Sequence, residues 1–215
     1  MVSQINITAK TFGGPRRADP GTGFLGADTM KIGILSDTHL KEPLLEFKRM
    51  IEAHFPGVDK IIHAGDFVDM SVAEYLSSQK ELLAVCGNMD TMDIRRTFPQ
   101  KRMIKVKGFR IGLVHGGGSP FGIESRVKEQ LDELARGDCL LGTGSEGAGE
   151  GIGSGSERKD LDVIIYGHTH IPANHQVRGI LFFNPGSLTR SFIHRATLGI
   201  LHIGEKIEGE IIRVE

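Results

Sequence analysis

From Lys31 onward, the hydrophobic positions alternate between short continuous runs, typical of buried strands, and stretches with a helical period. Apolar runs occupy 31–35, 60–62 and 82–85. Between them lie two predicted helices, one from Pro43 to about His54 that a proline opens and one from Ser71 to Ser78 that a serine caps. A strand–helix–strand–helix–strand order implies a parallel sheet.

The following part of the chain predicts a hairpin, an amphipathic helix and several short strands. The segments 102–106 and 110–114 flank a Lys-Gly-Phe turn and are typical of a hairpin. Apolar residues recur at helical spacing from Ile123 to Arg136. Beyond a buried run at 163–165, short strands are expected at 176–177, 180–183, 197–203 and 206–214. This tail suits a second sheet packed on the first, so we expect an α/β (α+β) fold.

Two segments lack the patterning of a packed core. Residues 1–29 hold Gly-Pro and Gly-Thr-Gly sequences without a sustained period, and we expect a flexible N-terminal extension. Its Arg16-Arg17 pair is not followed by an apolar stretch, which disfavours a targeting signal. Glycine, serine and glutamate dominate 142–156, so a flexible insert is expected at about 137–160. The insert interrupts one domain, 30–215, and does not mark a domain boundary.

Composition excludes several classes of protein. The 215 residues are 39% hydrophobic and 25% charged, as in a globular domain of ordinary size. A formal net charge of −1 gives no basic field for binding long nucleic acid. Only Cys86 and Cys139 are present, which excludes a disulfide framework, and no long apolar segment predicts a membrane span. We therefore expect a cytoplasmic protein with no membrane partner.

Residues that can bind a divalent metal follow five of the apolar runs. They are Asp37, His39, Asp66, Asn88, His115, His168 and His170. The carboxyl ends of strands in α/β proteins converge on one crevice, and residues two apart in extended backbone point to one face. Oxygen and imidazole donors without thiolate suit Mn²⁺, Fe or Zn²⁺ better than Ca²⁺ and disfavour a structural zinc site. The pattern predicts a catalytic metal centre.

The blocks around these residues resemble, in order, those of the calcineurin-like metallophosphoesterases. The blocks are Asp37-Thr38-His39, Gly65-Asp66-Phe67-Val68-Asp69, Gly87-Asn88-Met89-Asp90, His115-Gly116 and Gly167-His168-Thr169-His170. The small size and the Asn184-Pro185-Gly186-Ser187 block are similar to the YfcE-type phosphodiesterases, whose non-catalytic relative is the retromer scaffold subunit. The resemblance runs from Met30 to the end. It implies a four-layer αββα metallophosphoesterase sandwich of two mixed β-sheets flanked by helices.

The resemblance also implies roles for the seven residues. Asp37, His39, Asp66 and His170 would hold a first metal ion, and Asp66, Asn88, His115 and His168 a second, with Asp66 bridging. Asp66, Asn88 and His115 would be the catalytic residues. Manganese is expected first, with Ni²⁺, Zn²⁺, Fe or Co²⁺ as alternatives. Such a dinuclear site hydrolyses small phosphodiesters with a metal-bound hydroxide, and its formal charge weakly favours diesters.

Met89 departs from the wider superfamily, in which many members have a histidine after Gly-Asn that protonates the leaving oxygen. A thioether cannot donate a proton, so we expect turnover mainly of esters with good leaving groups. A phosphomonoesterase or nucleotide phosphatase, and a non-catalytic scaffold on the same fold, remain alternatives. The expected partner is a small phosphodiester or nucleotide, and a homo-oligomer is left open.

Other polar residues near the motifs have two interpretations each. Asn88 and Arg190 are candidate substrate-binding residues, although Arg190 and Arg195 are more often solvated cations. Asp69 and Asp90 are expected to cap helices rather than orient ligands. His63 is equally consistent with the core and with a position behind the metal centre.

Overall fold

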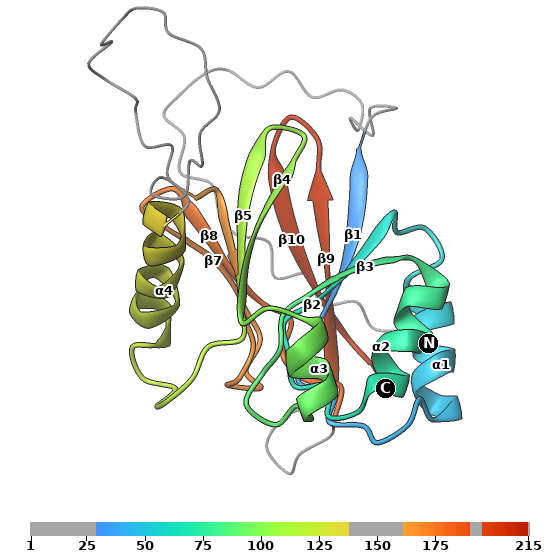
Figure 1. Cartoon of the computed structure of the whole chain (residues 1–215). Coiled ribbons are helices and arrows are strands. Elements are labelled where there is room, and N and C mark those ends of the chain that lie inside the picture. Colours follow the sequence, from blue (N-terminus) through green and yellow to red (C-terminus); the bar gives the residue numbers. More distant parts are fainter. Residues whose placement is uncertain (1–28, 138–160, 190–194, 215) are drawn as a thin grey trace, which may run out of the picture.

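The computed structural model describes residues 29–137, 161–189 and 195–214 (Figure 1). Its elements are β1 (Met30–Leu35), α1 (Leu45–His54), β2 (Lys60–His63), α2 (Met70–Gln79), β3 (Glu81–Ala84), α3 (Met92–Thr97), β4 (Lys101–Val106), β5 (Phe109–Val114), α4 (Ile123–Gly137), β6 (Val163–Ile165), β7 (Ala173–Val177), β8 (Ile180–Asn184), β9 (Thr197–Ile203) and β10 (Ile207–Arg213). The predicted extension at 1–29 (except Thr29), the core of the insert at 137–160 and Arg190 lie outside the described residues.

The predicted helices are confirmed, with two corrections at their N-termini. Helix α1 begins at Leu45 with Leu44 at its N-cap, so Pro43 precedes the helix and does not open it. Helix α2 begins at Met70, and its cap is Asp69, whose Oδ1 accepts a hydrogen bond from the Ser71 N–H at 3.0 Å. The prediction of a serine cap was wrong. Ser71 is the second residue of the helix, and its main-chain N–H is the group that the Asp69 carboxylate caps. The expected cap at Asp90 implied a helix after it, but no bounds were predicted for α3, since its six residues are too few to show a period.

Ten strands form two mixed sheets of five strands each, in the orders β10-β9-β1-β2-β3 and β4-β5-β6-β8-β7. Strands β1, β2 and β3 are parallel, as predicted, and β4 and β5 form the predicted hairpin. The expectation that the whole tail builds the second sheet was wrong. Strands β7 and β8 join that sheet, whereas β9 pairs antiparallel with β1 in the first. Strand β9 is buried except at Ile200 and His202, which are partly exposed, and it lies between β1 and β10 in the sheet.

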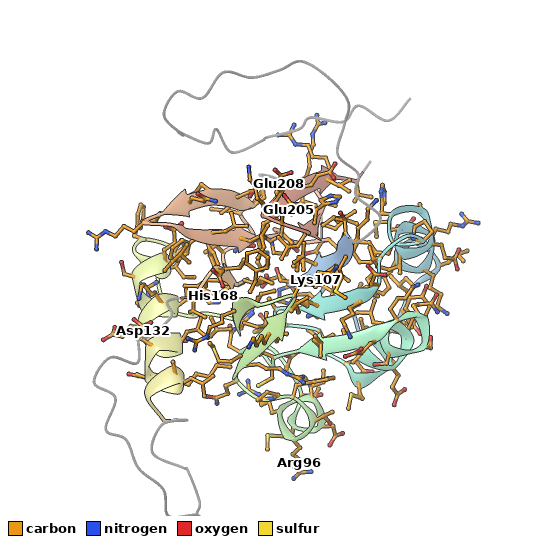
Figure 2. The ribbon with its side chains drawn as sticks, turned by 90° about the horizontal axis from the view of Figure 1, so that it is seen from above. Arg96, Lys107, Asp132, His168, Glu205 and Glu208 are labelled. Carbon is orange, nitrogen blue, oxygen red and sulfur yellow. The ribbon has the colours of Figure 1, made fainter. Side chains whose placement is uncertain are left out.

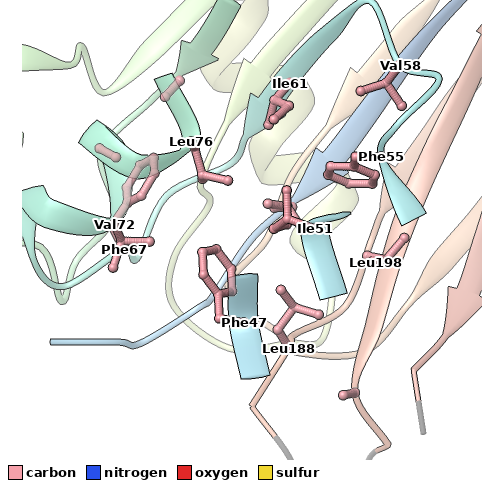
Figure 3. Close-up of a cluster of buried hydrophobic side chains, with 14 of the residues drawn as sticks. Phe47, Ile51, Phe55, Val58, Ile61, Phe67, Val72, Leu76, Leu188 and Leu198 are labelled. Carbon is pink, nitrogen blue, oxygen red and sulfur yellow. The ribbon is translucent and has the colours of Figure 1, made fainter. Parts of the chain in front are cut away.

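Three apolar clusters separate four layers (Figure 2). One cluster packs α1, α2 and α3 on the outer face of the first sheet, with Phe47, Ile51, Phe67 and Leu76 at its centre (Figure 3). A second fills the space between the sheets, and the third packs α4 on the outer face of the second sheet. The predicted four-layer αββα arrangement is confirmed.

The carboxyl ends of β1, β2 and β3 in one sheet lie at the same end of the sandwich as those of β5 and β6 in the other. The loops that follow these five strands all carry predicted ligands. Among the helices of the described ranges, none has the length and apolarity needed to cross a membrane.

Candidate metal centre

An unbroken series of side-chain contacts links the seven predicted ligands. Asp37 and His39 follow β1, Asp66 follows β2, Asn88 follows β3, His115 follows β5, and His168 and His170 follow β6. Four of these residues come from the first sheet and three from the second. Asp37 and His170, which are 133 positions apart in the sequence (170 − 37), therefore meet at one end of the sandwich.

One group of donors surrounds the buried carboxylate of Asp37. Its Oδ1 lies 3.3 Å from Nε2 of His170 and 3.9 Å from Nε2 of His39. The two Nε2 atoms are themselves 3.1 Å apart. One donor atom from each of these three residues lies within 4.8 Å of the others, a spacing that one metal ion can span.

A second group forms around His115 and adjoins the first. Nε2 of His115 lies 3.3 Å from Oδ2 of Asp66 and 4.0 Å from Oδ1 of Asp37. Oδ1 of Asn88 lies 3.1 Å from Nε2 of His115 and 3.1 Å from Nδ1 of His168. Asp37 and Asp66 thus stand between the two groups, each within 4 Å of histidines from both.

The backbone is strained at five of the seven positions. The φ angles are +52° at Asp37, +48° at His39, +60° at Asp66, +69° at His168 and +58° at His170. Residues other than glycine rarely adopt such left-handed conformations, and non-glycine strain of this kind concentrates at functional sites. All five residues are predicted ligands, and their side chains belong to the two adjoining groups described above.

Main-chain carbonyls orient two of the imidazoles. Nδ1 of His115 lies 2.8 Å from the carbonyl oxygen of Ala64, so this nitrogen carries the hydrogen and Nε2 faces Asp66. Nε2 of His168 lies 2.9 Å from the carbonyl oxygen of Gly118, so its Nδ1 faces Asn88. A carbonyl behind a ligand histidine fixes which nitrogen points at a metal.

The carboxylates and imidazoles favour one another's charged forms. Burial opposes ionisation of Asp66, but hydrogen bonds from His115 and from the Met89 N–H at 2.7 Å leave its pKa lowered. Burial likewise opposes the charge on His115, yet Asp66 and Asp37 leave its pKa raised. The hydrogen bond to Asp37 raises the pKa of His170. Two buried carboxylates facing histidine nitrogens, with no thiolate, form a donor set that fits divalent metal ions.

Asp90 and Arg126 support the centre, and sequence reasoning missed both roles. The Asp90 carboxylate accepts hydrogen bonds from the N–H groups of Asp66, Val68 and Gly87. It is therefore not a helix cap, which corrects the prediction, because α3 begins two residues later with Thr91 at its N-cap. The Arg126 guanidinium donates to the carbonyls of Gly117, Ser119 and Phe121, holding the loop that contains Gly118.

Glycines allow the ligand loops to approach closely. A Cβ atom at Gly167 would lie 2.7 Å from Oδ2 of Asp37, and one at Gly87 would overlap Oδ1 of Asp66. Neither carboxylate is the free end of a flexible chain, because both are fixed by hydrogen bonds. The glycines of the Gly-Asn and Gly-His blocks are therefore required sterically, in addition to the chemical role predicted for Asn88 and His168.

A cavity of about 330 Å³ adjoins the second group. Asn88 and His115 line it together with Cys86, Arg95, Gln100, Lys101 and Gln130. Its lining residues come from β4, β5 and α4, and from the segment after β3 together with α3.

Comparison with known proteins agrees with this geometry. The family model described as the calcineurin-like phosphoesterase superfamily domain matches residues 30–206. The chain belongs to this superfamily. A probable metallophosphoesterase of Methanocaldococcus jannaschii is 32% identical over 201 residues, which are 94% of this chain and 90% of that protein. The predicted family is therefore confirmed.

Solved structures show the same metallophosphoesterase fold. An archaeal phosphodiesterase superposes with a TM-score of 0.59 at 25% identity, covering 86% of this chain and 100% of its own. Vacuolar protein sorting 29 of Cryptosporidium parvum superposes with a TM-score of 0.62 at 18% identity, covering 87% of this chain and 92% of its own. The second likeness concerns the fold alone.

The remaining predicted positions of this metallophosphoesterase are either buried in the core or exposed to solvent. His63 is fully buried, stacks on Phe67 and contacts Thr38 at 3.3 Å, so it belongs to the core behind the centre. Burial, with the charge of His115 as a smaller cause, holds the pKa of His63 well below its usual value. Arg195 is exposed. Cys86 is a buried thiol whose pKa burial raises, as expected of a small core residue.

Proposed function

We propose that this protein is a metal-dependent phosphodiesterase that hydrolyses small phosphodiesters at a dinuclear centre. The observation that carries the proposal is the convergence of seven nitrogen and oxygen donors in two adjoining groups, five of them on left-handed backbone. Strain of this kind costs of order 1–3 kcal/mol at each residue, and a structural turn would avoid it with glycine.

The donor set divides between two ions in a manner that agrees with the family pattern. Asp37, His39 and His170 would hold one ion, and Asn88, His115 and His168 the other, with Asp66 between them. Two bound divalent ions lower the pKa of water and neutralise the charge that develops on phosphorus. Manganese is our first choice, since oxygen and imidazole donors suit it.

The protein's own residues position these groups before substrate arrives. Carbonyls of Ala64 and Gly118 fix the two imidazoles, and Asp90 fixes the loops of Asp66 and Gly87. Asn88 offers an amide beside both His115 and His168, and its N–H groups can contact a phosphate oxygen. Preorganised donors of this kind stabilise a transition state without reorganising.

Met89 supports a preference for activated diesters. Its side chain is 58% exposed, and its main-chain N–H is the part that contacts Asp66. The position at which many relatives have an acid thus presents a thioether, which cannot protonate a leaving alkoxide.

Rates with two nitrophenyl esters test the proposal. Purified protein loaded with Mn²⁺, Ni²⁺, Co²⁺ or Zn²⁺ is assayed with bis(4-nitrophenyl) phosphate and with 4-nitrophenyl phosphate, and metal content is measured in the same samples. We expect two ions per chain and a larger kcat/KM for the diester. A larger kcat/KM for the monoester would favour the phosphatase alternative, and no hydrolysis with any metal would favour a scaffold.

A further inference from the structure

The cavity beside Asn88 and His115 has a chemical character of its own. Two of its lining residues are cations, Arg95 and Lys101, and none is a carboxylate. Its volume of about 330 Å³ is at the lower end of the range for small-molecule sites. Because Asn88 and His115 belong also to the metal centre, a ligand can occupy both spaces at once.

Of the two cations of this cavity, Lys101 has one exposed carboxylate partner, whereas Arg95 has only carbonyl partners among the described residues. Arg95 donates from Nε to the carbonyl of Asp90 and from Nη2 to the carbonyl of Asn88, and it makes no ion pair with a described carboxylate. Carbonyl acceptors hold the guanidinium in place without cancelling its charge. Three of its five N–H groups are left for a ligand.

Lys101 is anchored in a similar manner. Its ammonium donates to the carbonyl of Gln130 at 2.9 Å and lies 3.3 Å from Oε2 of Glu133. Glu133 is 58% exposed, so this pair is screened by solvent and is weak. An ammonium has three hydrogens, and one remains for a ligand.

The cavity also presents two amide side chains. Within the described parts of the chain, neither Gln100 nor Gln130 has a side-chain hydrogen bond, and both line the cavity. An amide offers a donor and an acceptor to hydroxyls or to heterocyclic edges. Cations and free amides together suit a polar group that carries negative charge.

We propose that this cavity binds one alcohol arm of the phosphodiester, and that it selects arms bearing a second anionic group. This rests on the proposed function, because the scissile phosphate must lie at the metal centre for an arm to reach the cavity. Lys101 and Arg95 bind the second anion, and Gln100 and Gln130 contact the polar part of the arm. The substrate class is thus a diester with a further phosphate or carboxylate on one alcohol.

Two nitrophenyl diesters that differ by one phosphate test the proposal. They are the 4-nitrophenyl ester of thymidine 5′-phosphate and the same ester with a 3′-phosphate, assayed with the metal-loaded protein. We expect kcat/KM about tenfold higher for the second ester, since charge-assisted hydrogen bonds to phosphate add to binding. In Lys101→Gln this ratio should fall toward one.

A matched control uses another lysine beside a carboxylate. Lys128 lies on α4, pairs with Asp132 and is not part of the cavity lining, so Lys128→Gln should keep the wild-type ratio. An equal ratio in the wild-type protein, an unchanged ratio in Lys101→Gln, or the same loss in Lys128→Gln would overturn the proposal.

Calorimetric titration of the same two esters separates this proposal from the proposed function. If neither ester is hydrolysed, phosphodiesterase activity is refuted, and the ratio of dissociation constants decides about the cavity alone. A tenfold tighter binding of the 3′-phosphate ester that Lys101→Gln abolishes would support the anion site. Equal binding, or no binding of either ester, would overturn it.

Discussion

The carboxylate of Asp90 accepts a hydrogen bond from the main-chain N–H of Asp66, with 3.1 Å between Oδ2 and the nitrogen. The same carboxylate accepts from Val68 and Gly87, so one buried side chain ties the loop after β2 to the loop after β3. Asp66 also holds a left-handed conformation at this point. Asp90 is therefore a positioning residue for the centre.

Asp90→Ala should lower both stability and metal affinity, because three main-chain N–H groups lose their acceptor. A buried unsatisfied group costs about 1–3 kcal/mol, so we expect a loss of roughly 3 kcal/mol in urea unfolding. Metal titration should show weaker binding. Asp69→Ala is the control, since it removes a cap worth about 1 kcal/mol without affecting the metal. Equal metal affinity in the two variants would contradict the positioning role.

Asp66→Asn should be the most damaging single change at the centre. The substitution weakens the binding of both proposed ions at once. We therefore expect loss of bound metal and a fall in kcat/KM with bis(4-nitrophenyl) phosphate of at least about 100-fold. Asp162→Asn is a matched control, because Asp162 accepts from the Arg110 N–H at the opposite end of β6. Near-normal activity in Asp66→Asn would exclude the bridging role.

Gly87→Ala should abolish metal binding by sterics alone. The added methyl group would overlap Oδ1 of Asp66 and force the carboxylate from its place. Gly57→Ala, at an exposed turn with no neighbour within 4 Å of the added atom, should change the free energy of unfolding by less than about 1 kcal/mol. Metal content after dialysis compares the two, and full occupancy in Gly87→Ala would show that the loop can yield.

Metal binding should weaken as the pH falls. In the metal-free protein, the hydrogen bond to Asp37 raises the pKa of His170, and that of His115 is raised by Asp66 and Asp37 against the effect of burial. A raised pKa means that each imidazole keeps its proton to a higher pH, so a metal ion must displace protons there. Calorimetry in buffers of different ionisation enthalpy should detect proton release near neutral pH, and its absence would contradict these shifts.

Met89→His should extend the range of leaving groups. We expect roughly a tenfold gain with an alkyl diester and little change with bis(4-nitrophenyl) phosphate, since a general acid matters most for poor leaving groups. The exposed position of Met89 makes the substitution sterically acceptable. If the wild-type protein already cleaves an alkyl diester as fast as the nitrophenyl ester, another acid serves this step.

The strand ends could be predicted because their signal is local. Asp37 and Asn88 lie two and three residues after the apolar runs 31–35 and 82–85, and the rule that carboxyl ends converge brings them together. The pairing of β9 with β1 could not be read in the same way, because no short-range pattern says which sheet a late strand joins. Asp90 was misassigned for a related reason. Whether an aspartate caps a helix or accepts from distant loops depends on the tertiary path of the backbone.

The predicted ligands come from both sheets, and this division couples the candidate centre to the core. Phe183 and Ile34 belong to the apolar cluster between the sheets, and the thickness of that layer sets how far His115 and His170 stand from Asp37 and Asp66. Metal ions bound across this seam would fasten one sheet to the other. The packing between the sheets thus helps to set the distances between donors from opposite sheets. Selection on catalysis would therefore also act on buried side chains that never contact a substrate.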